Sequence, residues 1–241
     1  MQTVLPFGIP SRLGPVRERL LAAFGAQRAD ARPDPVSQLI KGCLAVRSGD
    51  EATRAALSRL RASFPDWAAM AEAPADAIEP LIAGVADADR KARQLPLLMR
   101  TIMRQRGPIY LDFLGYLPVD RAMDWLTALP GVGPAIAAAV LNVSTLTRPA
   151  LVVDGAVLRI AKRLGLVART ATSTQAYETL MDMAPKRWIA ADFFELHALL
   201  RRLAHTRCTA AEPGCGRCPL AGICRQVDVD GAQVVAWRKA G

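Results

Sequence analysis

Apolar residues recur every three or four positions along most of the chain, which is the spacing of one face of an α-helix. No stretch alternates between apolar and polar residues in a way that favours a β-strand. The pattern therefore predicts an all-α fold. The expected helices cover residues 16–24, 36–46, 50–64, 75–83, 86–106, 120–128, 135–143 and 154–164. Two more are expected between residue 165 and the cysteine-rich segment that follows.

Composition and charge narrow the class of partner. At 241 residues and 51% apolar content, the chain can bury a substantial core. The formal net charge is +9 and the pI is about 9.9, and such an excess of positive charge favours a polyanionic partner, most often nucleic acid. Arginine greatly outnumbers lysine, so a codon bias could account for part of this charge. Charge alone leaves the question open.

Compartment can be estimated from the apolar segments and the cysteines. The longest apolar stretch, residues 132–143, is too short to cross a bilayer. Residues 1–14 lack the pattern of a secretory signal, so we expect a cytoplasmic protein with no membrane contact. In a reducing compartment five cysteines argue against a disulfide framework, and four of them lie between residues 208 and 224. That clustering points to metal.

The cysteine cluster has the spacing C-x6-C-x2-C-x5-C, formed by Cys208, Cys215, Cys218 and Cys224. Four closely spaced thiolates suit either a structural zinc ion or an iron–sulfur cluster, and the spacing alone leaves both open. Cys43 stands apart in an apolar helix and is interpreted as a small buried hydrophobic residue.

A tight turn with two glycines joins two of the predicted helices at Leu129-Pro130-Gly131-Val132-Gly133. Glycines let backbone amides approach a ligand closely, and the helix that follows directs its positive N-terminal end to the same point. A phosphate would be satisfied there. For a lone Gly-x-Gly, an ordinary turn between helices is the more common explanation.

Three features together resemble the endonuclease III type of DNA glycosylase: this turn, the Val-Val-Asp sequence at 152–154 ahead of a helix, and the cysteine spacing. Residues 35–60 and 119–121 also look like the matching segments of that family, so the resemblance covers most of the chain. It implies two α-helical domains with double-stranded DNA in a cleft between them. Residues 34–147 would form a six-helix domain with a helix-hairpin-helix, and residues 1–33 and 148–241 an iron–sulfur domain.

The resemblance assigns DNA contacts and a cofactor to named residues. In that family the hairpin binds the DNA backbone, which assigns phosphate contacts to Leu129, Gly131, Val132 and Gly133. The four clustered cysteines would hold a four-iron four-sulfur cluster that supports a DNA-facing loop. In this chain the loop at 209–214 contains Glu212 and no lysine or arginine. We therefore expect its phosphate contacts to come from the flanking Arg207, Arg217 and Arg225.

By the same resemblance, Asp154 is the catalytic aspartate of a monomeric enzyme that removes a damaged or mismatched, flipped-out base from duplex DNA. Base loss develops positive charge on the sugar, and a fixed carboxylate lowers that barrier. The simpler role of Asp154 is to cap a helix N-terminus, and both roles can coexist. Arg47 stands where the family typically has a glutamine; it would fill the gap left by the flipped nucleotide, or is an exposed arginine at a helix end.

Relatives that also cut the strand carry a lysine two residues beyond the second hairpin glycine, where this chain has Ala135. An alanine cannot form a Schiff base, so the sequence predicts base removal by water with weak or absent lyase activity. The alternatives are a lyase using another lysine, such as Lys162 or Lys41, and a non-catalytic iron–sulfur DNA-binding protein. Gly42 lies near the position of the glutamate that adenine-mismatch glycosylases require, which disfavours that specificity. For His197 and His205 we expect packing or phosphate contacts.

Overall fold

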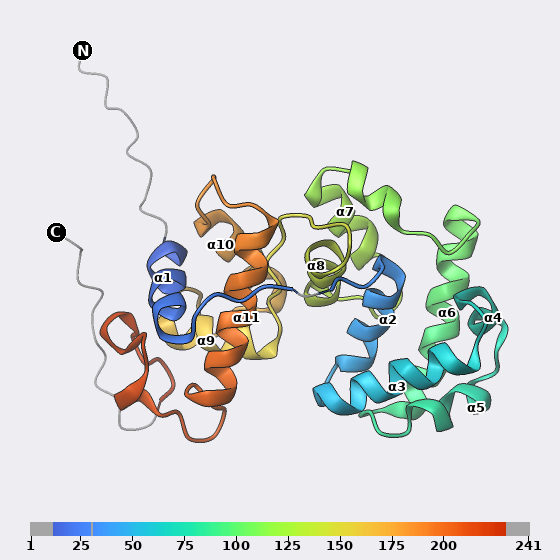
Figure 1. Cartoon of the computed structure of the whole chain (residues 1–241), viewed down its shortest axis with the longest axis horizontal. Helices are drawn as coiled ribbons and strands as arrows, with labels where there is room; N and C mark the ends of the chain where they lie inside the picture. Colours follow the sequence, from blue (N-terminus) through green and yellow to red (C-terminus); the bar gives the residue numbers. More distant parts are fainter. Residues whose placement is uncertain (1–11, 30, 230–241) are drawn as a thin grey trace, which may run out of the picture. The chain divides into compact units, whose positions relative to one another are not determined.

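The computed structural model describes residues 12–29 and 31–229, and within these ranges it contains helices and no β-strand (Figure 1). The all-α prediction is confirmed. No helix in the described ranges is long and apolar enough to span a membrane. The elements are α1 (Leu13–Phe24), α2 (Pro35–Ala45), α3 (Asp50–Ser63), α4 (Trp67–Glu72), α5 (Ala75–Ile78), η1 (Glu79–Ile82), α6 (Ala88–Arg106), η2 (Asp112–Tyr116), α7 (Val119–Thr127), α8 (Pro134–Val143), α9 (Gly155–Leu164), α10 (Ser173–Met183), α11 (Ala190–Thr206), η3 (Cys215–Arg217) and η4 (Ala221–Ile223).

Contacts divide the described chain into two compact units. The first contains residues 12–27, 153–188 and 195–229, and the second contains residues 28–152 and 189–194. The second unit is wider than the range 34–147 expected from the sequence, and it includes a short segment from much later in the chain. That segment is held by side chains of the second unit: Asn142 Nδ2 donates to the carbonyl of Ala190 at 2.8 Å, and the guanidinium of Arg32 lies 4.9 Å from the ring centre of Phe194.

The second unit is organised around α8, whose small apolar residues pack against α2 and α7. Ala137, Ala138 and Leu141 are fully buried. A Cβ added at Gly42 on α2 would lie 2.8 Å from Cγ2 of Ile136 on α8, so the two helices approach closely at this point. Any larger residue at position 42 would require Ile136 to move. α3, α4, α5 and α6 pack around this pair, with α4 against α6 and α3 against α2.

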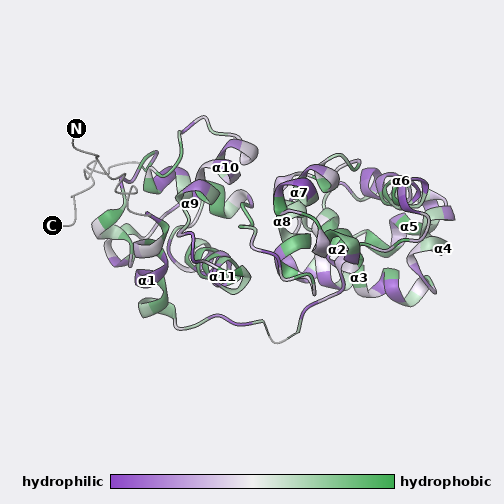
Figure 2. Cartoon of the chain, turned by 90° about the horizontal axis from the view of Figure 1, so that it is seen from above, coloured by the Kyte–Doolittle hydropathy of each residue, from purple (hydrophilic) through white to green (hydrophobic). Residues whose placement is uncertain are grey.

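The first unit joins α1 to α9, α10 and α11. Leu20 of α1 and Leu199 of α11 are fully buried, and Arg202 of α11 donates to the carbonyl of Phe24 at 3.0 Å. Glu195 pairs with Arg17 and accepts a hydrogen bond from the amide of Gln27 at 3.2 Å. Hydrophobic and hydrophilic positions mix along each helix, as expected for amphipathic helices that bury one side (Figure 2).

Two of the differences from the sequence prediction have a clear local cause. The helix expected at 75–83 is short and continues as the 3-10 helix η1, because Pro80 cannot donate the backbone hydrogen bond that an α-helix needs there. The prediction missed α4, a helix of only six residues. Its N-terminus is capped by Asp66, whose carboxylate accepts from the amide of Ala69 at 2.7 Å. The preceding Pro65 and this aspartate were the available signal.

Candidate functional site

The two glycines of the turn between α7 and α8 have different conformations. Gly131 has φ of 77°, in the left-handed region that favours glycine, whereas Gly133 has φ of −92°, which any residue can adopt. A Cβ added at Gly133 would meet nothing within 4 Å. The backbone of the turn therefore requires glycine at 131 and does not require it at 133.

Gln94 of α6 supports the turn, a contact that the sequence did not indicate. Its side-chain amide donates to the carbonyl of Pro130 at 3.3 Å. A Cβ added at Gly131 would lie 1.1 Å from Gln94 Nε2. Any side chain at 131 would therefore displace Gln94, and the glycine allows α6 to brace the turn.

Leu129 and Val132, two of the residues assigned to phosphate contacts, have buried side chains, 2% and 5% exposed. The amide of Val132 donates to the carbonyl of Leu129 at 3.2 Å. Both residues therefore hold the turn together, and an anion outside it could reach only backbone. Among the described residues, the amides of Gly131 and Gly133 have no hydrogen-bond acceptor within the chain, so these are the donors the turn offers.

Arg47 projects from a strained turn after α2. Its φ of 59° is unusual for a residue with a side chain, and that side chain is 73% exposed. Asp87 also has a positive φ, of 55°, and pairs with Arg47 at 3.2 Å and with Arg90 at the same distance. Strained residues persist where the surroundings fix them, so the exposed position of Arg47 is a property of the local fold.

Lys91 of α6 holds the turn that carries Arg47 by hydrogen bonds to its backbone. Its buried ammonium donates to the carbonyls of Leu44 at 2.9 Å and Val46 at 2.7 Å, and to Ser48 Oγ at 3.1 Å. Ser48 Oγ in turn accepts from the amide of Ala86 at 3.0 Å. Burial lowers the pKa of Lys91, and the nearby carboxylate of Asp87 opposes this effect. No sequence pattern indicated this role of Lys91.

Asp154 caps α9, as the sequence predicted. Its Oδ1 accepts from the amides of Ala156 at 3.0 Å and Val157 at 2.9 Å. Its Oδ2 lies 3.3 Å from Nε2 of His197 and 3.6 Å from a guanidinium nitrogen of Arg201, both on α11. The side chain of Asp154 remains 26% exposed. Sequence reasoning missed both α11 contacts.

These contacts keep the Asp154 carboxyl ionised. Burial acts to raise its pKa, but the hydrogen bond and charge of His197, the amide of Val157 and the charge of Arg201 together outweigh burial. The resulting pKa is about 2. A group with this pKa carries a full negative charge throughout the neutral range.

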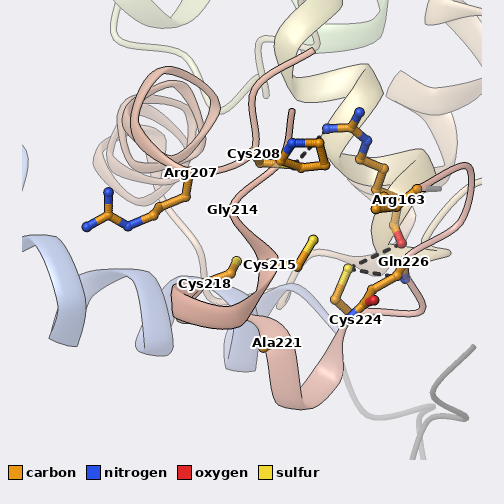
Figure 3. A pocket seen from close by; sticks show the side chains of 11 residues that line it. Arg163, Arg207, Cys208, Gly214, Cys215, Cys218, Ala221, Cys224 and Gln226 are labelled. Atoms are coloured by element: carbon orange, nitrogen blue, oxygen red, sulfur yellow. Dashed lines mark hydrogen bonds between the residues drawn. The ribbon is translucent and has the colours of Figure 1, made fainter. Parts of the chain in front are cut away.

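The four clustered cysteines line one pocket in the first unit, together with Arg163 and Arg207 (Figure 3). The space free of protein atoms in this pocket is about 330 Å³, including its open mouth. Among the described residues, no three or more His, Cys, Asp or Glu side chains are placed to hold a single metal ion. The four thiols have in common that they line this pocket.

Two arginines of α9 hold the loop that follows the first cysteine, and sequence reasoning missed both. Arg163 is buried and donates to Sγ of Cys208 at 3.4 Å and to the carbonyl of Ala210 at 3.0 Å. Arg159 donates to the carbonyl of Cys208 at 3.1 Å. The only available signal was their spacing, because residues four apart lie on the same side of a helix.

Two of the four thiols in the pocket are partly desolvated. Burial raises the pKa of Cys224 to about 11 and also raises the pKa of Cys218, with the other cysteines adding to the effect. Metal binding must therefore displace their protons. The sulfur of Cys224 accepts from the amide of Gln226 at 3.4 Å, so a backbone donor already faces it.

The three arginines flanking the loop have different environments. Arg217 is exposed in η3, and the side chain of Arg207 extends away from the cysteines in Figure 3. Arg225 packs on the end of α9, where a Cβ added at Gly165 would lie 2.4 Å from its Cδ. Of the three, Arg217 is the most exposed to a ligand in solvent, whereas Arg207 and Arg225 are partly buried.

Solved structures with the same fold include endonuclease III. The chain superposes on the structure of a trapped endonuclease III–DNA covalent intermediate with a TM-score of 0.73 at 24% identity, covering 91% of this chain and 97% of that one. A thermostable thymine-DNA glycosylase gives a TM-score of 0.69 at 20% identity, with 88% and 94% covered. At sequence identities below 25%, these superpositions show that the chain shares the fold of these proteins.

Sequence comparison gives the family. Residues 40–186, more than half of the chain, match the family described as HhH-GPD superfamily base excision DNA repair protein. The chain belongs to this superfamily, and the endonuclease III-like resemblance expected from the sequence is confirmed.

Several relatives with a similar sequence are endonuclease III proteins. Endonuclease III of Bacillus subtilis (strain 168) is 35% identical over 127 residues, which cover 53% of this chain and 55% of that protein. Endonuclease III of Synechocystis sp. is 29% identical over 191 residues, 79% of this chain and 80% of that protein. Endonuclease III homolog 2, chloroplastic, of Arabidopsis thaliana is 31% identical over 77% of this chain and 47% of its own length. The chain thus spans about half the length of the first and third of these relatives.

Proposed function

We propose that this protein is a DNA glycosylase that hydrolyses the N-glycosidic bond of a damaged or mismatched base in duplex DNA, acting as a monomer. Membership of a base excision repair superfamily and the net charge of +9 support this assignment. The observation that carries it is Asp154, a part-exposed carboxylate that is ionised at neutral pH and fixed at the N-terminus of α9.

The chemistry needs a fixed negative charge. When the bond between sugar and base breaks, its electron pair leaves with the base and the sugar becomes positively charged. A preorganised carboxylate stabilises such a charge without having to reorient during the reaction. Asp154 meets this requirement because Oδ1 is held by two backbone amides and Oδ2 faces His197.

Base removal uses water in this proposal, without an amine nucleophile. Ala135 occupies the first turn of α8, two residues after Gly133, and its methyl group has no nucleophilic atom. The abasic product should therefore keep an intact strand.

DNA binding would rest on backbone donors and arginine side chains. The amides of Gly131 and Gly133 are suited to phosphate oxygens, and such contacts hold DNA without reading its sequence. Arg207 and Arg217 would add phosphate contacts. Arg47, held outward by Lys91 and Asp87, would enter the gap left by the flipped nucleotide.

Cys208, Cys215, Cys218 and Cys224 would hold a four-iron four-sulfur cluster, and their common pocket fits this group. When bound, the cluster cross-links the loop through four thiolates and so holds it in one shape. Arg163 and Arg159 hold the same loop through Cys208, Thr209 and Ala210.

The test is base release from a panel of duplexes, each carrying one damaged or mismatched base. Purified, cluster-loaded protein is incubated with each duplex, and alkali then cuts the strand at any abasic site. We expect a cut after alkali with at least one duplex, and none without alkali.

Asp154→Asn is the matched variant, because asparagine also caps helices but carries no charge. We expect it to bind the same duplex and release no base. Tight binding by the wild type with no base loss on any duplex would favour the non-catalytic DNA-binding alternative.

A further inference from the structure

The Asp154 carboxylate has partners at both oxygens. A carboxylate offers about four lone-pair positions; two backbone amides donate to Oδ1, Nε2 of His197 lies 3.3 Å from Oδ2, and Arg201 forms an ion pair with Oδ2 at 3.6 Å. A water that gave its proton to Oδ1 would displace a backbone amide, and at Oδ2 it would compete with His197.

The two side chains of α11 that contact Asp154 are neighbours on the surface of the helix. His197 and Arg201 are four residues apart, which places them on the same face of the helix. The His197 side chain is only 14% exposed, so its ring is held by packing. His205, one further turn along α11, lies 3.4 Å from Arg201. Among the described residues, the charged or titratable side chains that contact Asp154 are His197 and Arg201.

We propose that His197 is a positioning residue that donates its Nε2 proton to Oδ2 of Asp154, and with Arg201 restricts Asp154 to the role of a fixed negative charge. The inference rests on the proposed glycosylase function. The bond between C1′ and the base nitrogen breaks, and its electron pair leaves with the base. The water oxygen then bonds to C1′, and the proton it loses is taken up by the departing base or solvent. Asp154 is not protonated at any step.

The low pKa of Asp154 agrees with this role. A general base works best when its pKa lies near the pH of the reaction, and a carboxyl with a pKa of about 2 holds a proton too weakly to serve well. Removal of His197 leaves burial less opposed, so the pKa of Asp154 should rise.

Three variants of His197 test the assignment. Phenylalanine keeps a ring and removes the donor. Glutamine can place an amide nitrogen where Nε2 lies, whereas the shorter asparagine places it nearer to Nδ1. We expect His197→Phe and His197→Asn to lower the single-turnover rate of base release by about tenfold to a hundredfold, the usual effect of a lost hydrogen bond to a charged group. His197→Gln should stay within about threefold of wild type, because the donor is restored.

Two further measurements separate positioning from a general structural role. The affinity for a duplex carrying an uncleavable abasic analogue should stay within about twofold in all three variants, because Nε2 of His197 faces Asp154 and the side chain is only 14% exposed, which replaces the phosphate contact considered from the sequence. As the pH is lowered, His197→Phe should lose its activity at a higher pH than the wild type does. A wild-type rate in His197→Phe would overturn the inference, and so would a faster rate, which would mean that Asp154 acts as a base.

The inference can fail separately from the proposed function. Loss of activity in Asp154→Asn with full activity in His197→Phe would retain the glycosylase and remove the role of His197. If no duplex on the panel loses a base, the titration of Asp154 can still be followed by NMR on protein labelled at the aspartate carboxyl carbon. An Asp154 titration that is the same in wild type and His197→Phe would then overturn the proposed contact.

Discussion

Replacing the two hairpin glycines by alanine, one at a time, tests the structure of the turn. From the structure we expect the same substitution to have different effects at these two positions, which are two residues apart. Gly131 has a positive φ and is braced by Gln94, whereas Gly133 has an ordinary φ and open space where a Cβ would lie. Gly131→Ala should therefore destabilise the protein, and Gly133→Ala should not.

The magnitude follows from the two environments. Alanine at a left-handed position costs about 1–2 kcal/mol, and displacement of Gln94 from the carbonyl of Pro130 loses a hydrogen bond of about 1 kcal/mol. The lower flexibility of the unfolded chain offsets about 0.4–1 kcal/mol of this. The free energy of unfolding should thus fall by about 2 kcal/mol in Gly131→Ala, which lowers Tm by about 4–8 °C for a chain of this size. In Gly133→Ala the favourable contribution is offset by the weaker preference of alanine for the N-cap of α8, so Tm should stay close to that of the wild type.

The assay pairs thermal unfolding, followed by circular dichroism, with the binding of a labelled duplex that carries an uncleavable abasic analogue. If the amides of the turn meet a phosphate, the methyl group added in Gly133→Ala occupies open space beside the Gly133 amide and should hinder the approach of that phosphate. Its dissociation constant for the duplex should then rise about tenfold, the effect of losing roughly one charge-assisted hydrogen bond. If Gly133→Ala lowered Tm as much as Gly131→Ala does, the difference between the two glycines would be refuted. If Gly133→Ala bound DNA as tightly as wild type, the phosphate contact at the turn would be refuted.

Three further predictions concern other parts of the chain. Borohydride should trap no covalent adduct between wild-type protein and lesion-bearing DNA, whereas Ala135→Lys should yield one; a strong wild-type adduct would mean that another lysine reaches the sugar. Cys215→Ser should give a protein without the visible colour of an iron–sulfur cluster, while Cys43→Ala, outside the pocket, should stay coloured; a colourless wild type that remains folded and active would contradict the cluster. Lys91→Met should release the turn that carries Arg47. We expect it to slow base release from lesion-bearing DNA more than it weakens binding to undamaged DNA. If both quantities fell by the same factor, Lys91 would contribute only to general stability.

Local patterns were sufficient to predict most helices and the cap at Asp154. The apolar spacing of α8 and α9 depends on residues a few positions apart, and an N-cap depends on amides two and three residues away. The same reasoning missed the switch to η1 at Pro80, because the positions around that proline continue a helical pattern.

The supporting side chains could not be predicted, because their partners lie far along the chain. His197 is 43 positions from Asp154, Arg163 is 45 positions from Cys208, and Lys91 is 47 positions from Leu44. A sequence pattern does not encode which helix faces which over such separations. Each of these side chains had a simpler interpretation as packing or as a solvated charge, and only the fold shows its partner.

The account depends most directly on whether Asp154 enables release of a free base. One incubation of cluster-loaded protein with a lesion-bearing duplex, analysed by mass spectrometry for the free base and by gel for the strand, tests this. The wild type should yield the free base and an uncut strand with an abasic site, and Asp154→Asn should yield neither product while binding the duplex equally well. Base release by Asp154→Asn at the wild-type rate would contradict the account.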